Sequence, residues 1–177
     1  MIEVFSDGGC EPNPGVGGWG FVAYQDGAEI HSEFGGDPET TNNRMELEGA
    51  LRALTWMAVN CAGREASLLS DSRYVVDGCN DWRHKWKAKG WKRGKEEIKN
   101  PGLWRSLDEV LTIYPLKLTW CKGHSGIVGN ERADELSMMG IGHVTSRDIT
   151  LCHVTVPGQP EEIGDYLSEE YRRLMAE

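Results

Sequence analysis

Four carboxylates stand where the chain is expected to change from one element to the next: Asp7, Glu46, Asp71 and Asp134. Strand ends and the helix starts that follow them meet at one edge of an α/β sheet, so we expect the four to gather there. Gathered carboxylates repel one another unless a cation neutralises them. Oxygen ligands without His or Cys favour Mg²⁺ or Mn²⁺, and two such ions can clamp both oxygens of an in-line phosphoryl displacement.

Each carboxylate also has an ordinary structural explanation. Glu46 follows Asn43 by three residues, which is the spacing of a helix capping box. Asp71 could cap the helix that follows it, Asp134 could be a solvated helix residue, and Asp7 could be a turn aspartate. Both kinds of explanation stay open at this point.

The elements that must position these residues follow from periodicity and turn chemistry. Predicted strands cover 2–7 (stopped by Gly8-Gly9), 19–24, a segment ending at Gly35-Gly36, 67–70 and 116–121. Predicted helices begin at Thr40-Asn43, Ser72 and Pro101, and a last one spans 130–139 and is closed by Gly140-Ile-Gly142. This order predicts an α/β fold, a mixed sheet covered by helices.

Net charge is distributed unevenly. The chain of 177 residues carries −9 in total, yet residues 83–99 hold eight Lys and Arg against two Glu. Such asymmetry is typical of a polyanion-binding arm on an acidic body. The alternative is a solvated lysine-rich helix.

Composition excludes several classes of protein. The length suits one domain, and no apolar run approaches the ~20 residues that span a bilayer. The N-terminus has no secretory signal pattern, and the five Cys include no C-x-x-C pair. We therefore expect a cytoplasmic protein without a membrane partner.

Five segments together resemble the signature blocks of type 1 ribonuclease H, in its bacterial ribonuclease HI-like form. They are residues 6–15 (SDGGCEPNPG), 40–47 (TTNNRMEL), 70–75 (SDSRYV), 82–92 (WRHKWKAKGWK) and 122–134 (KGHSGIVGNERAD). The resemblance covers residues 1–141. It implies a ribonuclease H-like fold, with a five-stranded mixed sheet of order 3-2-1-4-5 and helices on both faces.

The resemblance implies an endonuclease that hydrolyses the RNA strand of RNA/DNA hybrids, leaving 5′-phosphate and 3′-hydroxyl ends. Asp7 would bridge two Mg²⁺ ions, for which Mn²⁺ can substitute. Asp134 would hold the ion at the attacking water, and Glu46 and Asp71 the ion at the leaving oxygen. His124, in a Gly-bounded loop, would shuttle a proton or help product release; the alternative is a solvated loop histidine. Glu131 would tune the ion at the water.

The resemblance also implies the contacts with the hybrid. The candidate minor-groove residues are Gly9, Cys10, Asn13, Asn42 and Asn43. Thr41 and Asn100, near Asn13, would grip a phosphate of the DNA strand. Asn42 and Asn43 also suit a helix cap.

The basic segment supplies the remaining candidate contacts. Trp82 and Trp86 would pack on deoxyriboses of the DNA strand, the alternative being a place in the core, which we favour for Trp91 and Trp104. The basic arm contributes Lys85, Lys87 and Lys89. Arg73 stands where bacterial relatives commonly carry an amide, and it could reach a phosphate or a base edge.

The segment 142–177 lies beyond the resemblance. It holds seven acidic residues against three basic ones, so we expect no nucleic-acid contact from it. A strand over 149–156 and an amphipathic helix over 161–176 are predicted, packed on the same domain or at a dimer contact. We expect a monomer without an organic cofactor, with a dimer through this segment as the alternative.

Two rival functions remain. One is a hybrid-binding protein that does not cleave, which would need a broken carboxylate set. The other is a DNA nuclease of the wider superfamily, which would share the acidic edge but not the arm or the 40–47 block.

Overall fold

A mixed sheet forms the frame of the molecule in the computed structural model, which describes residues 1–146 and 153–154. Its strands are β1 (Ile2–Cys10), β2 (Gly15–Gln25), β3 (Ala28–Thr40), β4 (Ala66–Ser70), β7 (Thr119–Trp120) and β8 (His153–Val154). The helices are α1 (Asn42–Asn60), α2 (Arg73–Asp77), η1 (a π-helical turn, Gly78–Trp82), α3 (Arg83–Ala88), α4 (Pro101–Ile113) and α5 (Val128–Thr145). A small hairpin joins β5 (Lys92–Arg93) to β6 (Glu96–Glu97).

The sheet order is β7-β4-β1-β2-β3-β8. Its first five strands confirm the predicted order 3-2-1-4-5, with β7 as the fifth predicted strand. β1, β4 and β7 run parallel, while β1, β2 and β3 form an antiparallel meander. β8 pairs antiparallel with β3, inside the strand predicted over 149–156. The helix predicted over 161–176 lies outside the described residues.

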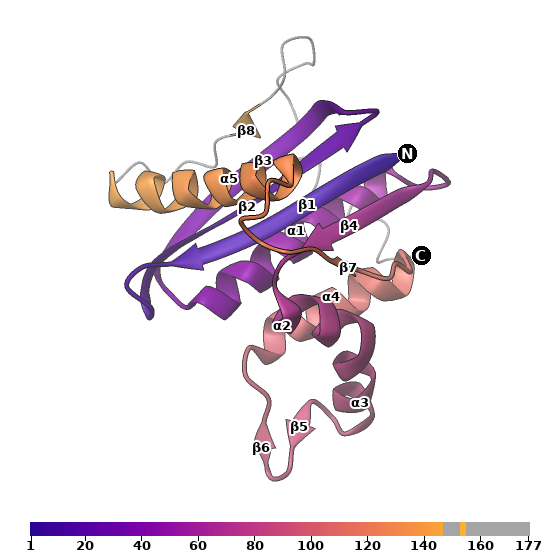
Figure 1. The fold of residues 1–177 in the computed structure, drawn as a ribbon. Helices are drawn as coiled ribbons and strands as arrows, with labels where there is room; N and C mark the ends of the chain where they lie inside the picture. The colour runs from indigo at the N-terminus through magenta and orange to yellow at the C-terminus, as the bar shows by residue number, and fades with distance from the viewer. Residues whose placement is uncertain (147–152, 155–177) are drawn as a thin grey trace.

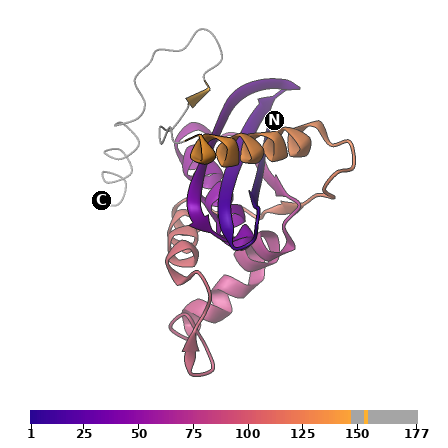
Figure 2. The same cartoon turned by 90° about the vertical axis from the view of Figure 1, so that its left-hand side faces the viewer.

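Helices cover both faces of the sheet, as predicted (Figures 1 and 2). On one face, α1 packs on the strands with α4 behind it, and the large core includes Leu47, Leu54 and Trp104. On the other face, α5 packs on β1–β3 around Phe5, Val22 and Leu136. The apolar residues of α1 face this core at helical spacing, because burial stabilises an amphipathic helix that propensity alone would not.

Two glycine predictions are wrong for one physical reason. β1 does not stop at Gly8 but runs to Cys10, and α5 does not end at Gly140 but runs to Thr145. A Cβ at Gly8 would overlap the backbone of Met45 and Glu46 in α1, and one at Gly140 would overlap Gly35 in β3. These glycines let helix and sheet backbones approach closely; they do not break the elements that carry them.

Other strand boundaries also differ from the predicted ones. β2 and β3 are longer than predicted, because the meander pairs from Gly15 to Thr40. The strand predicted over 116–121 is shorter in the structure and covers only Thr119–Trp120. The helix starts near Asn42 and at Pro101 are confirmed.

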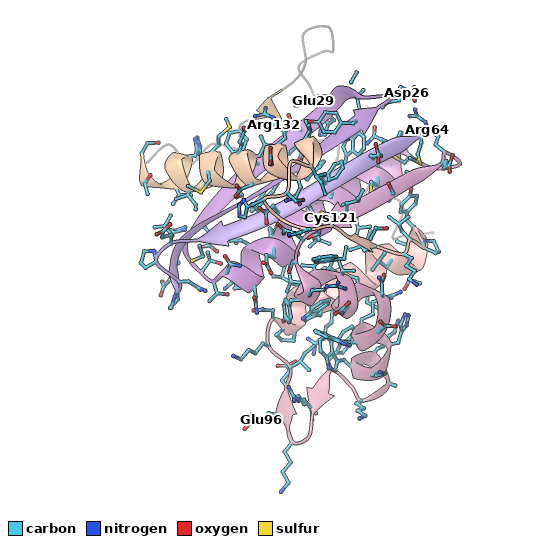
Figure 3. The ribbon with its side chains drawn as sticks, viewed as in Figure 1. Asp26, Glu29, Arg64, Glu96, Cys121 and Arg132 are labelled. Atoms are coloured by element: carbon cyan, nitrogen blue, oxygen red, sulfur yellow. The ribbon has the colours of Figure 1, made fainter. Side chains whose placement is uncertain are left out.

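The basic arm, defined as residues 82–99, extends from the sheet between α2 and α4 (Figure 1). Its root is a cluster of edge-to-face rings, in which the ring centre of Trp86 lies 5.1 Å from that of Trp104 and 5.7 Å from that of Trp82. Trp104 is fully buried and Trp91 packs against the core, as we expected of both. At the far tip, Figure 3 shows Glu96 pointing away from the body.

A buried ion cluster holds the arm on α4. Asp108 is 4% exposed, and its two oxygens accept hydrogen bonds from Arg83 Nη1 at 2.5 Å and Lys87 Nζ at 2.6 Å. Arg83 is itself nearly buried, and the single carboxylate pairs with two cations of the arm. The arm is therefore tied to the body by charge as well as by aromatic packing.

Among the described residues, no helix has both the length and the apolar run to cross a membrane.

We predict that Asp108→Ala lowers the free energy of unfolding by about 3 kcal/mol, because it leaves a buried guanidinium without its counterion. Urea unfolding followed by circular dichroism measures this. The matched control is Glu109→Ala, one residue along and exposed, which should change stability by less than about 0.5 kcal/mol. Equal effects of the two substitutions would contradict the role of the buried ion cluster in stability.

Candidate active site

The four carboxylates come from two strands and two helices that meet at one edge of the sheet. Asp7 lies on β1, and Asp71 follows the last residue of β4, its parallel neighbour. Phe5 pairs with Leu69, so each aspartate lies two residues beyond this last pair and the two lie side by side. Glu46 lies one turn into α1, whose backbone touches β1 at Gly8. Asp134 lies on α5, across the sheet.

The electrostatics of Asp7 show that the four act on one another. Burial, together with the charges of Asp71, Asp134 and Glu46, raises the pKa of Asp7 from 3.8 to about 7, and burial is the largest cause. Only the backbone N–H of Gly8, which donates to Asp7 Oδ1 at 2.7 Å, opposes the rise. The structure thus brings together the four residues that the sequence singled out.

Glu46 is held by side chains, and not as a capping box. Its Oε2 accepts a hydrogen bond from Ser72 Oγ at 2.6 Å, and its Oε1 accepts one from Asn42 Nδ2 at 3.0 Å. The N-cap of α1 is Thr41, which makes no side-chain cap. Burial raises the pKa of Glu46, while the bond from Ser72 lowers it. The capping-box explanation is therefore wrong.

Asp71 is likewise not a helix cap, because Ser72 takes that role by accepting from the N–H of Val75. Asp71 Oδ2 instead accepts a hydrogen bond from the buried amide of Asn130 at 3.1 Å. Cys121 Sγ donates in turn to Asn130 Oδ1 at 3.2 Å. Burial raises the pKa of the Cys121 thiol to about 11, which keeps it protonated as the donor. This chain of bonds orients the Asp71 carboxylate.

No cation of the described residues neutralises this group. Within residues 1–146, none of the four carboxylates forms an ion pair with Lys, Arg or His. No three of the described His, Cys, Asp or Glu side chains are gathered tightly enough to hold a metal ion unaided. The donor set nevertheless suits hard divalent cations, because it offers only oxygen and an excess of negative charge.

His124 and Glu131 lie on the loop that leads into α5. His124 is exposed, with a left-handed backbone (φ 49°), and Gly126 follows it at φ 81°. The N–H of Gly126 donates to Glu131 Oε1 at 3.0 Å, so Glu131 ties this loop to α5. A histidine in this backbone conformation is uncommon and fits a residue placed for function.

The candidate minor-groove residues lie beside Glu46. The N–H of Asn42 donates to Asn13 Oδ1 at 3.2 Å, so the 11–14 loop and the start of α1 form one surface. Cys10 Sγ contacts the carbonyls of Pro12 and Thr40. The other candidates on this surface are Gly9, on β1, and Thr41 and Asn43, at the start of α1. Asn100 lies apart, at the N-cap of α4.

The arm candidates lie outside this cluster (Figure 1). Trp82 and Trp86 are both half-buried, and Trp86 packs against the core. Lys85 and Lys89 are exposed and form no ion pair among the described residues, whereas Lys87 pairs with Asp108. Arg73 begins α2, and its Cζ lies 4.0 Å from the ring centre of Trp120.

Sequence reasoning missed the residues that hold the carboxylates: Ser72, Asn130, Trp120 and Cys121. Trp120 Nε1 donates to the carbonyl of Asp71 at 2.9 Å. Cys121 directly follows β7, the strand at one edge of the sheet (Figure 3). Ser72 adjoins Asp71 in the chain, which was an available signal. The others come from segments 49 to 59 residues away, so no local pattern indicated them.

Comparisons with known proteins agree with this geometry. The family model described as RNase H matches residues 1–141. A curated ribonuclease H of Aromatoleum aromaticum is 46% identical over 145 residues, covering 81% of this chain and 92% of the relative. A ribonuclease HI of Pseudomonas syringae pv. tomato is 45% identical over 144 residues, covering 81% and 93%.

Solved structures are similar as well. The crystal structure of LC9-RNase H1, described as a type 1 RNase H with the type 2 active-site motif, matches with a TM-score of 0.70 at 28% identity, covering 88% of this chain and 77% of that one. LC11-RNase H1, solved in complex with an RNA/DNA hybrid, matches with a TM-score of 0.62 at 24% identity, covering 82% and 99%. The match of the family model and the identity to curated relatives, over a site with four convergent carboxylates, establish that the chain belongs to the ribonuclease H family, as a type 1 member of the bacterial ribonuclease HI kind.

Proposed function

We propose that this chain hydrolyses the RNA strand of RNA/DNA hybrids with the help of two divalent cations, Mg²⁺ or Mn²⁺. The observation that carries the proposal is the set of four convergent carboxylates, with Asp7 and Glu46 desolvated by burial and no counter-cation among the described residues. Family membership adds the substrate class, and a neighbour of the same fold, LC11-RNase H1, has been solved with a hybrid bound.

Asp7 would be shared by both ions, since the other three carboxylates all act on it. Asp134 would complete one ion site, on the side of the attacking water. Glu46 and Asp71 would complete the other, on the side of the leaving 3′ oxygen. When bound, the ions lower the pKa of water and stabilise charge on the phosphoryl oxygens. Ser72, Asn42 and Asn130 fix the orientation of the carboxylates through their hydrogen bonds.

In the reaction, the oxygen of water bonds to phosphorus and keeps one of its protons, while the bond from phosphorus to the 3′ oxygen breaks. The other proton of the water goes to the leaving 3′ oxygen. The reaction yields a 5′-phosphate and a 3′-hydroxyl. His124, exposed on the loop before α5, moves a proton at this site or helps the product to leave. Glu131 supports it by holding the loop at Gly126.

The hybrid would lie across the surface of Gly9, Cys10, Asn13, Asn42 and Asn43, which suits the shallow minor groove of an A-like duplex. Thr41 and Asn100 would hold a DNA phosphate. The basic arm would reach the DNA strand with Trp82, Trp86, Lys85 and Lys89. Lys87 would contribute less, because Asp108 already holds its ammonium group.

We also propose that residues 1–141 are the catalytic domain and that 142–177 are an extension on the same domain, although α5 itself continues to Thr145. The chain would act in the cytoplasm as a monomer and use no organic cofactor.

The central test uses one labelled hybrid of about 20 base pairs. We expect cleavage of the RNA strand alone, dependent on Mg²⁺ and lost with EDTA. Asp7→Asn should lower kcat by about three orders of magnitude or more while hybrid binding persists, because it removes the shared carboxylate. Binding without any cleavage by the natural chain would favour a non-cleaving hybrid binder. Cleavage of duplex DNA would favour a DNA nuclease.

The raised pKa of Asp7 predicts a pH-dependent stability. A carboxyl whose pKa rises from 3.8 to about 7 on folding destabilises the fold progressively as the pH rises from about 4 to about 7. Below about pH 4 it has no effect, because it is protonated in both states. Asp7→Asn should therefore stabilise the chain by about 2 kcal/mol at pH 8 in EDTA and by nothing near pH 4. Thermal unfolding measures this. A variant no more stable than the natural chain at pH 8 would contradict the conclusion that the Asp7 carboxylate destabilises the fold.

The lysines of the arm predict a salt effect. Lys85→Ala with Lys89→Ala should raise KM about 3- to 10-fold at 0.1 M salt, leave kcat unchanged and reduce the salt slope of log KM by about 2, because each lysine neutralises one phosphate. Lys87→Ala should change the slope less but lower stability. The control is Arg64→Gln, which removes an exposed charge bound to Gln25 at the other end of β1. An unchanged slope in the double variant would exclude the arm from substrate binding.

A further inference from the structure

An exposed tryptophan beside the carboxylates holds an arginine. Trp120, the last residue of β7, keeps 38% of its surface exposed, which is unusual for so large an apolar side chain. The guanidinium carbon of Arg73 lies 4.0 Å from the centre of its ring, within the range of a cation–π contact. β7 pairs with β4 at Ser70, so the stack lies directly beside Asp71.

The same indole also reaches the backbone of a metal-ligand candidate. Trp120 Nε1 donates to the carbonyl oxygen of Asp71 at 2.9 Å. One side chain therefore touches Asp71 through its edge and Arg73 through its face. The distance between the guanidinium and the carboxylate edge is fixed by this single ring.

Arg73 has no other partner among the described residues. It is exposed, and it forms no ion pair and no side-chain hydrogen bond there, although Asp71 and Glu46 lie close by. Stacking on the ring leaves the N–H donors of the guanidinium plane unused. A planar fork of free donors is the geometry that matches a phosphate.

The position of this fork defines its ligand. A phosphate bound at Asp71 would be the one that is cleaved, and Arg73 begins α2 two residues further along the chain. We propose that Arg73, held in place by Trp120, binds a phosphate of the RNA strand next to the cleaved one, and that Trp120 is the positioning residue of this contact. The proposal rests on the proposed function and adds to it a partner for Arg73 and a role for Trp120.

The two contacts of Trp120 predict separable effects. Trp120→Leu loses both contacts, so it should raise KM about 3- to 10-fold, approaching the effect of Arg73→Gln, and also lower kcat. Trp120→Phe keeps a ring for stacking but loses the N–H bond to Asp71, so it should lower kcat and leave KM nearly unchanged. Because Arg73 and Trp120 act through one contact, Trp120→Leu should add little to KM in the Arg73→Gln background.

The experiment measures KM and kcat on a set of hybrids, each with one RNA phosphate near the cleavage site replaced by a neutral methylphosphonate. The natural chain, Arg73→Gln, Trp120→Leu, Trp120→Phe and the charge control Arg64→Gln are compared. We expect one neutralised phosphate to raise KM for the natural chain and to abolish the difference from Arg73→Gln. Arg64→Gln should keep its full activity on every hybrid.

Three outcomes would overturn the proposal. First, Arg73→Gln could match the natural chain on every hybrid. Second, the effect of Arg73→Gln on KM could persist whichever phosphate is neutral. Third, Arg73→Gln could shift the cleavage sites without altering the salt slope of log KM, which indicates contact with a base edge. Failure of the natural chain to cleave any unmodified hybrid would instead overturn the proposed function. Thermal unfolding of each variant separates loss of folding from loss of contact. Arg73 is on the exposed surface, so the comparison of Arg73→Gln with the natural chain still tests the proposal if Trp120→Leu does not fold.

Discussion

Mutual repulsion of four carboxylates is the constraint on which the rest of this structure depends. Desolvation and three like-charged neighbours raise the pKa of Asp7 to about 7. No Lys, Arg or His of residues 1–146 pairs with any of the four to relieve it. The backbone must therefore hold them together against their charge. Parallel pairing of β1 with β4 does so for Asp7 and Asp71, and the absence of a side chain at Gly8 lets α1 bring Glu46 to them.

Hydrogen bonds then orient what the backbone has assembled. Ser72 and Asn42 occupy both oxygens of Glu46, and Asn130 occupies one of Asp71, with Cys121 behind it. Neutral donors of this kind fix a carboxylate without cancelling its charge, so it stays available to a cation. Gly123 adds a steric condition, because a Cβ there would overlap the carboxylate of Asp71. The loop beside Asp71 must therefore stay free of a side chain at this point.

Much of this could be predicted from the sequence, because it depends on local pattern. The mixed α/β sheet, the start of α1 and the convergence of the carboxylates follow from periodicity and from element ends, whereas the strand order followed from the resemblance to ribonuclease H. The ends of β1 and α5 could not be predicted, because Gly8 and Gly140 have the same local signature whether they stop an element or admit a neighbour. The supports of Asp71 were missed because Asn130 and Trp120 are remote in sequence. The pairing of Lys87 with Asp108 was missed for the same reason, since 21 residues separate them.

The uninterrupted course of α5 has a consequence for how the molecule can be extended. At the rise of an α-helix, the eleven residue steps from Asp134 to Thr145 place the end of α5 about 16 Å along the helix axis from Asp134. Gly140, where the helix crosses β3 closely, keeps that spacing rigid. A segment joined after Thr145 therefore starts outside the range of direct contact with the reacting phosphate. The end of α5 is thus a natural junction for attaching a tether or a fused module while the chemistry stays intact.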